Sequence, residues 1–150
     1  MKRLAKFEFE LEKIIKRSFD PIESLLPIVV GVSGGEDSVA LISSLSRIFS
    51  NNLDLIYVAH LNHNLRVESS SDQVFVQELA SRLGIKFFTK SVFNENNQSV
   101  ESWGREQRYI FFNEVLEATG SKFILTAHHK SDQAENVFMR IVNGRGLSGS

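Results

Sequence analysis

The most informative stretch of the chain is Val30-Gly-Val-Ser-Gly-Gly-Glu-Asp-Ser-Val-Ala-Leu41. It begins inside an apolar, β-branched run from Pro27 to Ser33, which is typical of a buried strand. The Ser-Gly-Gly turn interrupts that run, and apolar residues then recur at helical spacing from Ser38 to Phe49. A strand that passes through a glycine turn into a helix is the repeating unit of α/β folds.

The turn itself has the chemistry of a phosphate cradle. Glycines bring the backbone close to a ligand, and the following helix adds free amides at its positive end. Hydroxyls of Ser33 and Ser38 add donors, with Gly34, Gly35 and Glu36 between them. Because the turn contains no lysine, it differs from loops that hold β- and γ-phosphates through one. Asp37 could lie beside phosphates only with Mg²⁺ between them, so the turn predicts a metal-bound pyrophosphate. The alternative is an ordinary Gly- and Ser-rich turn.

Strands and helices are expected to alternate on either side of this unit. The expected helices cover Leu4–Arg17, Ser38–Phe49, Ser71 or Asp72 to Leu83, Ser99–Ala118, and Ser131 or Asp132 to Asn143. The expected strands cover Pro27–Ser33, Asp54–Ala59, Ile85–Val92 and Lys122–Ala127. Gly84 and Gly120 are predicted helix stops. We expect one α/β domain over residues 1–150, an open parallel sheet in the order 3-2-1-4 with helices on both faces. No fifth strand is expected.

Composition narrows the class of protein. The chain has 150 residues, 42% of them hydrophobic and 23% charged, as in an ordinary soluble domain. A net charge of −1 argues against autonomous RNA binding, which needs a basic surface. The absence of cysteine excludes disulfides, thiolate zinc sites and cysteine nucleophiles. No stretch has the length of a signal peptide or membrane span, so the cytoplasm is the expected location.

Histidines and carboxylates follow the other strands. His60 and His63 come after the second strand, and His128 and His129 after the fourth, where open α/β sheets bind ligands. Asp132 and Glu135 are three residues apart on one helix face and could join Asp37 in a Mg²⁺ site. The alternatives are packed histidines and carboxylates that merely complement a helix dipole.

Four segments together resemble one known family. Residues 33–38, SGGEDS, match the SGGxDS signature of the PP-loop ATP pyrophosphatase superfamily, whose fold is adenine nucleotide α-hydrolase-like. Residues 60–66 (HLNHNLR), 105–109 (REQRY) and 126–135 (TAHHKSDQAE) resemble the HxNHxLR, RxxRY and TAHHxxDQxE elements of tRNA(Ile)-lysidine synthetases. The chain departs from the family at Asn64, where Gly is usual, at Asn136, where Thr is usual, and in the closing glycine motif.

The resemblance implies a function and a set of site residues. It implies ATP-dependent attachment of L-lysine to C2 of the first anticodon cytidine of an isoleucine tRNA, through an adenylated base. ATP and Mg²⁺ would be bound by the turn with His60, Asn62 and His63, and the family assigns Arg108 and His128 to the catalytic step beside Asp37. The family continues beyond this length with tRNA-binding domains, so an incomplete catalytic domain is expected.

Three alternatives stay open. Another adenylating enzyme of the superfamily is one, although sulfur-inserting relatives use cysteines that this chain lacks. Amidotransferase-type synthetases fit the histidine and RxxRY elements poorly. A non-catalytic ATP-binding fragment is the third. A helix-face arginine exposed to solvent is the plain alternative for Arg108, and a homodimer is one alternative for the oligomeric state.

Overall fold

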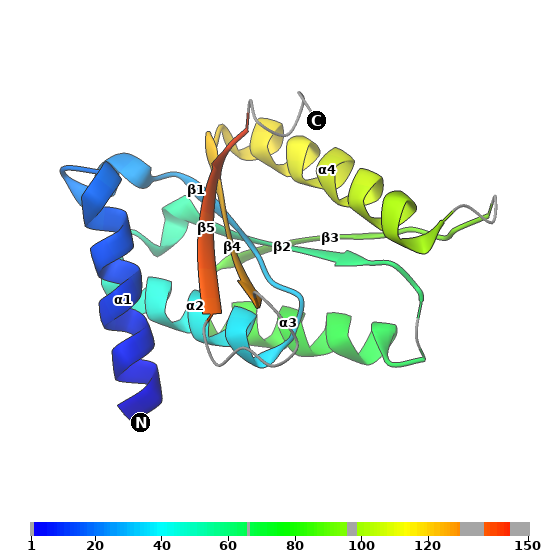
Figure 1. Cartoon of the computed structure of the whole chain (residues 1–150), viewed down its shortest axis with the longest axis horizontal. Helices are drawn as coiled ribbons and strands as arrows, with labels where there is room; N and C mark the ends of the chain where they lie inside the picture. The colour runs from blue at the N-terminus through cyan, green and yellow to red at the C-terminus, as the bar shows by residue number, and fades with distance from the viewer. Residues whose placement is uncertain (1, 66, 96–98, 130–136, 145–150) are drawn as a thin grey trace.

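A computed structural model describes residues 2–65, 67–95, 99–129 and 137–144 (Figure 1). The α-helices are α1 (Lys2–Ser18), α2 (Glu36–Ile48), α3 (Ser69–Leu83) and α4 (Val100–Thr119). The strands are β1 (Ile28–Gly31), β2 (Ile56–Asn62), β3 (Lys86–Ser91), β4 (Phe123–His129) and β5 (Val137–Asn143). Short 3-10 turns cover Ile22–Leu25 and Leu53–Leu55. No helix in these ranges is long and apolar enough to cross a membrane.

The strands form one sheet in the order β3-β2-β1-β4-β5. Neighbours from β3 to β4 are parallel, with Ile28 opposite both Ile56 and Phe123. This confirms the predicted α/β class and the order 3-2-1-4 for the first four strands. The carboxyl ends of β1, β2 and β4 therefore meet at one edge of the sheet, the edge at which open α/β sheets bind ligands.

The fifth strand corrects the sequence prediction. A helix was expected to run to Asn143 and no fifth strand was expected, but Val137–Asn143 is β5, antiparallel to β4. Its residues Ile141 and Val142 pair with Leu125 and Ile124 and pack against opposite faces of the sheet. Alternation of this kind is a strand pattern, and β5 occupies an edge of β4 that would otherwise lack a partner.

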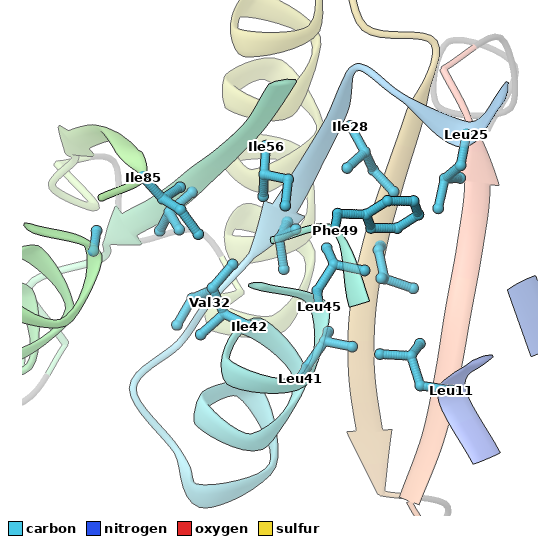
Figure 2. Close-up of a cluster of buried hydrophobic side chains, with 14 of the residues drawn as sticks. Leu11, Leu25, Ile28, Val32, Leu41, Ile42, Leu45, Phe49, Ile56 and Ile85 are labelled. Atoms are coloured by element: carbon cyan, nitrogen blue, oxygen red, sulfur yellow. The ribbon is translucent and has the colours of Figure 1, made fainter. Parts of the chain in front are cut away.

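Side-chain alternation along the strands builds a core on each face of the sheet. On one face, Ile28 and Val30 pack with residues of α1, α2 and α3 such as Leu11 and Leu45 (Figure 2). On the other face, Val29 packs with apolar residues of α4, and Figure 1 shows α4 alone on that side. The predicted coverage of both faces is confirmed. The interior residues Phe111, Phe112, Val115 and Leu116 of α4 are core, as their spacing indicates.

Helix ends agree with the sequence, whereas one strand end does not. Gly84 and Gly120 follow α3 and α4 with φ values of 75° and 69°, the left-handed conformation that ends helices. His60 and Asn62 were expected in a loop but lie within β2, each 4% exposed. Polar residues extend a strand when partners on neighbouring elements satisfy them, and both have such partners.

Candidate functional site

The turn after β1 has the backbone that the sequence predicts for it. Gly34 has φ +103°, a conformation that residues with a Cβ rarely adopt. Gly35 caps α2, which begins at Glu36. The first amides of an α-helix have no intrahelical acceptor and point out of its positive end. The turn therefore offers an anion site at the carboxyl end of β1.

Hydroxyl groups hold this turn in shape. Gly34 N donates to Ser38 Oγ at 3.1 Å, and Ser38 Oγ donates to the carbonyl oxygen of Gly35 at 2.9 Å. Gly35 N donates to Ser33 Oγ at 3.2 Å, and the two serine oxygens lie 3.3 Å apart. Ser38 is buried, whereas Ser33 is exposed. The buried Ser38 hydroxyl thus holds the backbone of the turn, whereas the exposed Ser33 hydroxyl is accessible to a ligand.

A cavity of about 230 Å³ opens beside the turn. Ser33, His63, Arg108 and Thr126 line it, one from each of the four segments singled out in the sequence. Its apolar lining consists of Gly31, Val32, Ala59, Leu61, Phe112 and Ala127. Arg108 is exposed at this cavity, so its guanidinium can meet a ligand there without a burial cost.

Gly31 allows the sheet and α4 to approach closely beneath the cavity. A Cβ at Gly31 would lie 2.9 Å from Phe112 Cζ and 3.0 Å from Thr126 Cγ2. Both distances are too short for carbon atoms, so any side chain at residue 31 would displace Phe112 or Thr126. The absence of a side chain at residue 31 therefore lets Phe112 and Thr126 approach the end of β1 beside the cavity.

His60 ties the second strand to the first. Its Nδ1 is 2.8 Å from the carbonyl oxygen of Val32, an acceptor, so Nδ1 carries the proton. The Nε2 of the neutral ring is then an acceptor. His60 lines a second cavity, of about 290 Å³, on the α3 side of β2, together with Asn62, Ser69 and Asp72. Ser33, Leu61 and His63 line both cavities.

Asn62 and Asn64 fix the chain that leaves β2. Asn62 Nδ2 donates to Gln73 Oε1 at 3.1 Å, and Asn62 Oδ1 accepts from Asn64 N at 3.0 Å. Asn64 has φ +55° and donates from Nδ2 to the carbonyl oxygen of Val92 at 3.1 Å. Asparagine tolerates this left-handed conformation better than other residues with a side chain. Asn64 can therefore stand where the related family has Gly.

His63 reaches across to α4. It hydrogen-bonds to the backbone of Gly104 and meets Trp103 edge-on, with 6.0 Å between ring centroids. Burial lowers the pKa of His63 below its ordinary 6.5, and the charge of Arg108 lowers it further. The bond to Gly104 opposes this shift, and His60 adds a smaller lowering of the same pKa. His63 is therefore neutral at pH 7 beside a permanent cation.

Of the three predicted metal ligands, Asp37 alone belongs to the described part of the chain, so the metal site stays a prediction. Asp37 and Glu36 line a cavity of about 260 Å³ between α1 and α2, with Leu4 and Phe7, and not the cavity of Arg108. Asp132 and Glu135 lie outside the described residues. His128 is in β4 opposite Phe138, one residue beyond Ala127 of the first cavity. The described residues contain no group of three His, Cys, Asp or Glu placed to hold a metal ion.

Sequence reasoning missed several residues that line or support the site. Thr126 and Leu61 line the first cavity, and Trp103 and Gly104 contact His63. The sequence could have indicated Gly104, because residues 104, 108 and 112 are spaced four apart and therefore lie on the same face of α4. No comparable signal exists for Leu61, whose position follows from strand pairing.

The chain is similar to known proteins over nearly its whole length. The PP-loop domain family matches residues 4–150. Curated relatives named tRNA(Ile)-lysidine synthase are 38% identical in Geobacter sulfurreducens over 97% of this chain and 32% of the relative, and 38% identical in Petrotoga mobilis over 97% and 48%. The relative from Thermus thermophilus is 42% identical over 79% and 24%. The chain thus spans about a quarter to a half of the length of these relatives.

Two solved structures share the fold at 14% identity each. One is the U34-tRNA thiolase NcsA from Methanococcus maripaludis, with a TM-score of 0.55 over 66% of this chain and 36% of that chain. The other is the NH3-dependent NAD synthetase from Campylobacter jejuni, with a TM-score of 0.51 over 82% and 54%. At this identity the likeness concerns the fold alone.

Proposed function

The chain belongs to the PP-loop domain family, and from that premise we propose that it is the ATP-binding part of a tRNA(Ile)-lysidine synthetase. The proposed reaction joins L-lysine to C2 of the wobble cytidine of isoleucine tRNA. The C2 oxygen of the base attacks the α-phosphorus of ATP, and pyrophosphate leaves. The lysine amine then attacks C2, and AMP leaves with that oxygen.

One observation carries the proposal. Four segments that are distant in sequence contribute Ser33, His63, Arg108 and Thr126 to a single cavity at the carboxyl edge of the sheet. A glycine turn with a left-handed residue and a helix amino terminus borders that cavity. This combination suits a nucleotide whose phosphates lie on the turn and whose reacting α-phosphate lies near Arg108.

The roles of individual residues follow from their positions. The turn from Ser33 to Ser38 would hold pyrophosphate through main-chain amides and the Ser33 hydroxyl. Arg108 would offset charge that develops on the phosphate or on the activated oxygen. His128, near the same edge at the end of β4, would hydrogen-bond or shuttle a proton there.

Mg²⁺ remains part of the proposal, with Asp37, Asp132 and Glu135 as its ligands. Asp37 lines the cavity between α1 and α2, and the other two lie outside the described residues. The described residues alone do not fit a complete metal site, so none of the steps above depends on the metal. We also propose a cytoplasmic location, because the substrate is a tRNA.

Binding of the tRNA is expected to need more surface than this chain offers. Its net charge is −1, and phosphate contacts usually require a basic face. The matched relatives are two to four times longer. These facts favour a second candidate, a domain that binds ATP but does not turn over alone; a homodimer would be another way to enlarge the surface.

Calorimetry and a turnover assay separate these candidates. ATP and pyrophosphate are titrated into the chain with Mg²⁺, and incorporation of radiolabelled lysine into an isoleucine tRNA transcript is then measured. Binding with incorporation supports the synthetase, and binding without it supports the ATP-binding domain. Pyrophosphate release without use of lysine would indicate another adenylating enzyme of this family. If neither ATP nor pyrophosphate binds, both candidates are wrong.

Arg108→Gln provides the residue-level test. We expect about a tenfold loss of affinity for ATP, the size of one charge-assisted hydrogen bond. Arg82→Gln, in the last turn of α3, removes the same charge away from the cavity and is the matched control. Equal effects of the two changes would mean that only net charge matters.

A further inference from the structure

We infer that His63 is a positioning residue that fixes the turn of α4 from which Arg108 reaches the cavity. The inference rests on the proposed function, because Arg108 is the proposed contact to the nucleotide. No motif assigns this task to His63, which the sequence placed among the nucleotide ligands.

Gly104 provides the space that His63 occupies. A Cβ at Gly104 would lie 3.7 Å from Cδ2 and 3.8 Å from Nε2 of His63. His63 thus lies against the bare backbone of the helix, in the place that a longer side chain at residue 104 would fill. The Trp103 ring packs edge-on against the His63 ring beside Gly104.

A hydrogen bond fixes the ring there. The bond between His63 and the backbone of Gly104 favours the protonated ring, so the imidazole is the donor. In the neutral ring the second nitrogen is then an acceptor. A helix carbonyl normally accepts from its own helix, so a second donor from His63, the residue that follows β2, couples the end of that strand to this turn of α4.

Arg108 is one helical turn beyond Gly104 on the same face of α4. Helix side chains lean toward the amino terminus, so the Arg108 side chain extends over the turn that His63 holds. Both residues line the first cavity, and the guanidinium is close enough to depress the pKa of the imidazole. The neutral His63 ring can position the Arg108 guanidinium without itself adding a positive charge that would bind the phosphate.

The charged and titratable groups around His63 come from three elements. Arg108 faces it from α4 and His60 from β2, while Asp72 of α3 lines the second cavity with it. Arg108 and His60 both disfavour the protonated ring. Acidification therefore adds a positive charge beside Arg108 and removes the acceptor nitrogen.

A double-mutant cycle tests the positioning role. ATP affinity is measured by calorimetry for the full chain, His63→Ala, Arg108→Gln and the double variant, with Arg82→Gln as control. We expect His63→Ala alone to weaken binding about fivefold and to change it less than about twofold when Arg108 is already Gln. Independent, multiplying losses would overturn the inference, because His63 would then act on the ligand directly.

Two further variants guard against a simple folding defect. His63→Gln keeps a side-chain N–H donor that reaches as far as Nε2, the ring nitrogen that lies beside Gly104, and should recover most of the affinity lost in His63→Ala. Gly104→Leu fills the place of His63 and should weaken binding like His63→Ala, whereas Gly104→Ala, with ordinary contact distances, should be near wild type. No difference between Leu and Ala at residue 104 would contradict the inference.

An NMR titration separates this inference from the proposed function. The His63 ring is followed with pH in the ligand-free chain and in Arg108→Gln. Its pKa should rise in the variant, because a cation has been removed. An unchanged pKa would overturn the pairing even if ATP binds. A raised pKa in a chain that binds no ATP would retain the pairing and reject the nucleotide site.

Discussion

Nδ1 of His60 donates a 2.8 Å hydrogen bond to the carbonyl oxygen of Val32. Val32 N in turn donates to the carbonyl oxygen of Ala59 at 3.0 Å, so the end of β1 is tied twice to β2. His60 is 4% exposed and Val32 is 2% exposed. This pair sets the direction in which the chain enters the Ser-Gly-Gly turn.

His60→Ala should therefore destabilise the protein. It leaves the buried carbonyl of Val32 without this donor and creates a void, at an expected cost of about 2–4 kcal/mol in the free energy of unfolding. His60→Asn retains a donor at the position of Nδ1 and should lose less. Urea denaturation measures both, and equal losses would contradict the role of this hydrogen bond.

Gly34→Ala should destabilise the turn through its backbone. The φ of +103° costs a residue with a Cβ about 1–2 kcal/mol, while the nearest contact of that Cβ, 3.5 Å to Val76 Cγ2, is ordinary. Gly35→Ser is the control, because Gly35 has φ −70° and serine caps a helix at least as well as glycine, so this change should cost less than about 0.5 kcal/mol. Urea denaturation of the pair decides, and similar losses in the two variants would argue against the left-handed turn.

Gly31→Ala should be rescued in part by a smaller residue at 112. Alone it pushes against Phe112 and Thr126 and should cost about 1–3 kcal/mol. In Gly31→Ala/Phe112→Leu the new methyl group gains space, so the double variant should be more stable than the two single losses predict, by at least about 0.5 kcal/mol. Strict additivity in chemical denaturation would show that the two residues do not share this contact.

Protonation of His63 should weaken the fold in mild acid. Because its pKa is lower in the folded chain than the ordinary 6.5, the unfolded chain binds the proton first as pH falls. Stability is fully present above pH 6.5 and is lost from there down to the folded pKa. Unfolding free energies at several pH values should show a shallower loss in His63→Asn than in wild type. Parallel curves would contradict the shift.

The local parts of the fold were predictable from sequence. Periodicity located α1 to α4 and β1 to β4 within a few residues, and Gly84 and Gly120 were identified as stops. These features depend on neighbours in the chain, where apolar spacing and glycine carry the information. The parallel sheet with helices on both faces followed from strand–helix alternation and right-handed crossovers, and the order 3-2-1-4 was expected for the PP-loop fold that the sequence resembles.

Features that depend on distant partners were not predictable. The apolar residues of 137–143 fit a helix face as well as a strand, and the edge of β4 decides between them. His60 and Asn62 looked like loop residues because Val32 and Gln73, which satisfy them, are remote in sequence. The cavity between α1 and α2 that Asp37 lines could not be predicted either, because it depends on the packing of two helices that are distant in sequence. The role of Asp37 at the phosphates stays a prediction.

The reversed direction of β5 has a practical use. Asn143 pairs with Phe123, at the opposite end of the strands from the edge where Ser33 and Arg108 lie, and it is exposed. Since the chain has no cysteine, Asn143→Cys would introduce a single thiol for a dye or a surface tether. The nucleotide edge would then face away from the support, which suits immobilised binding measurements.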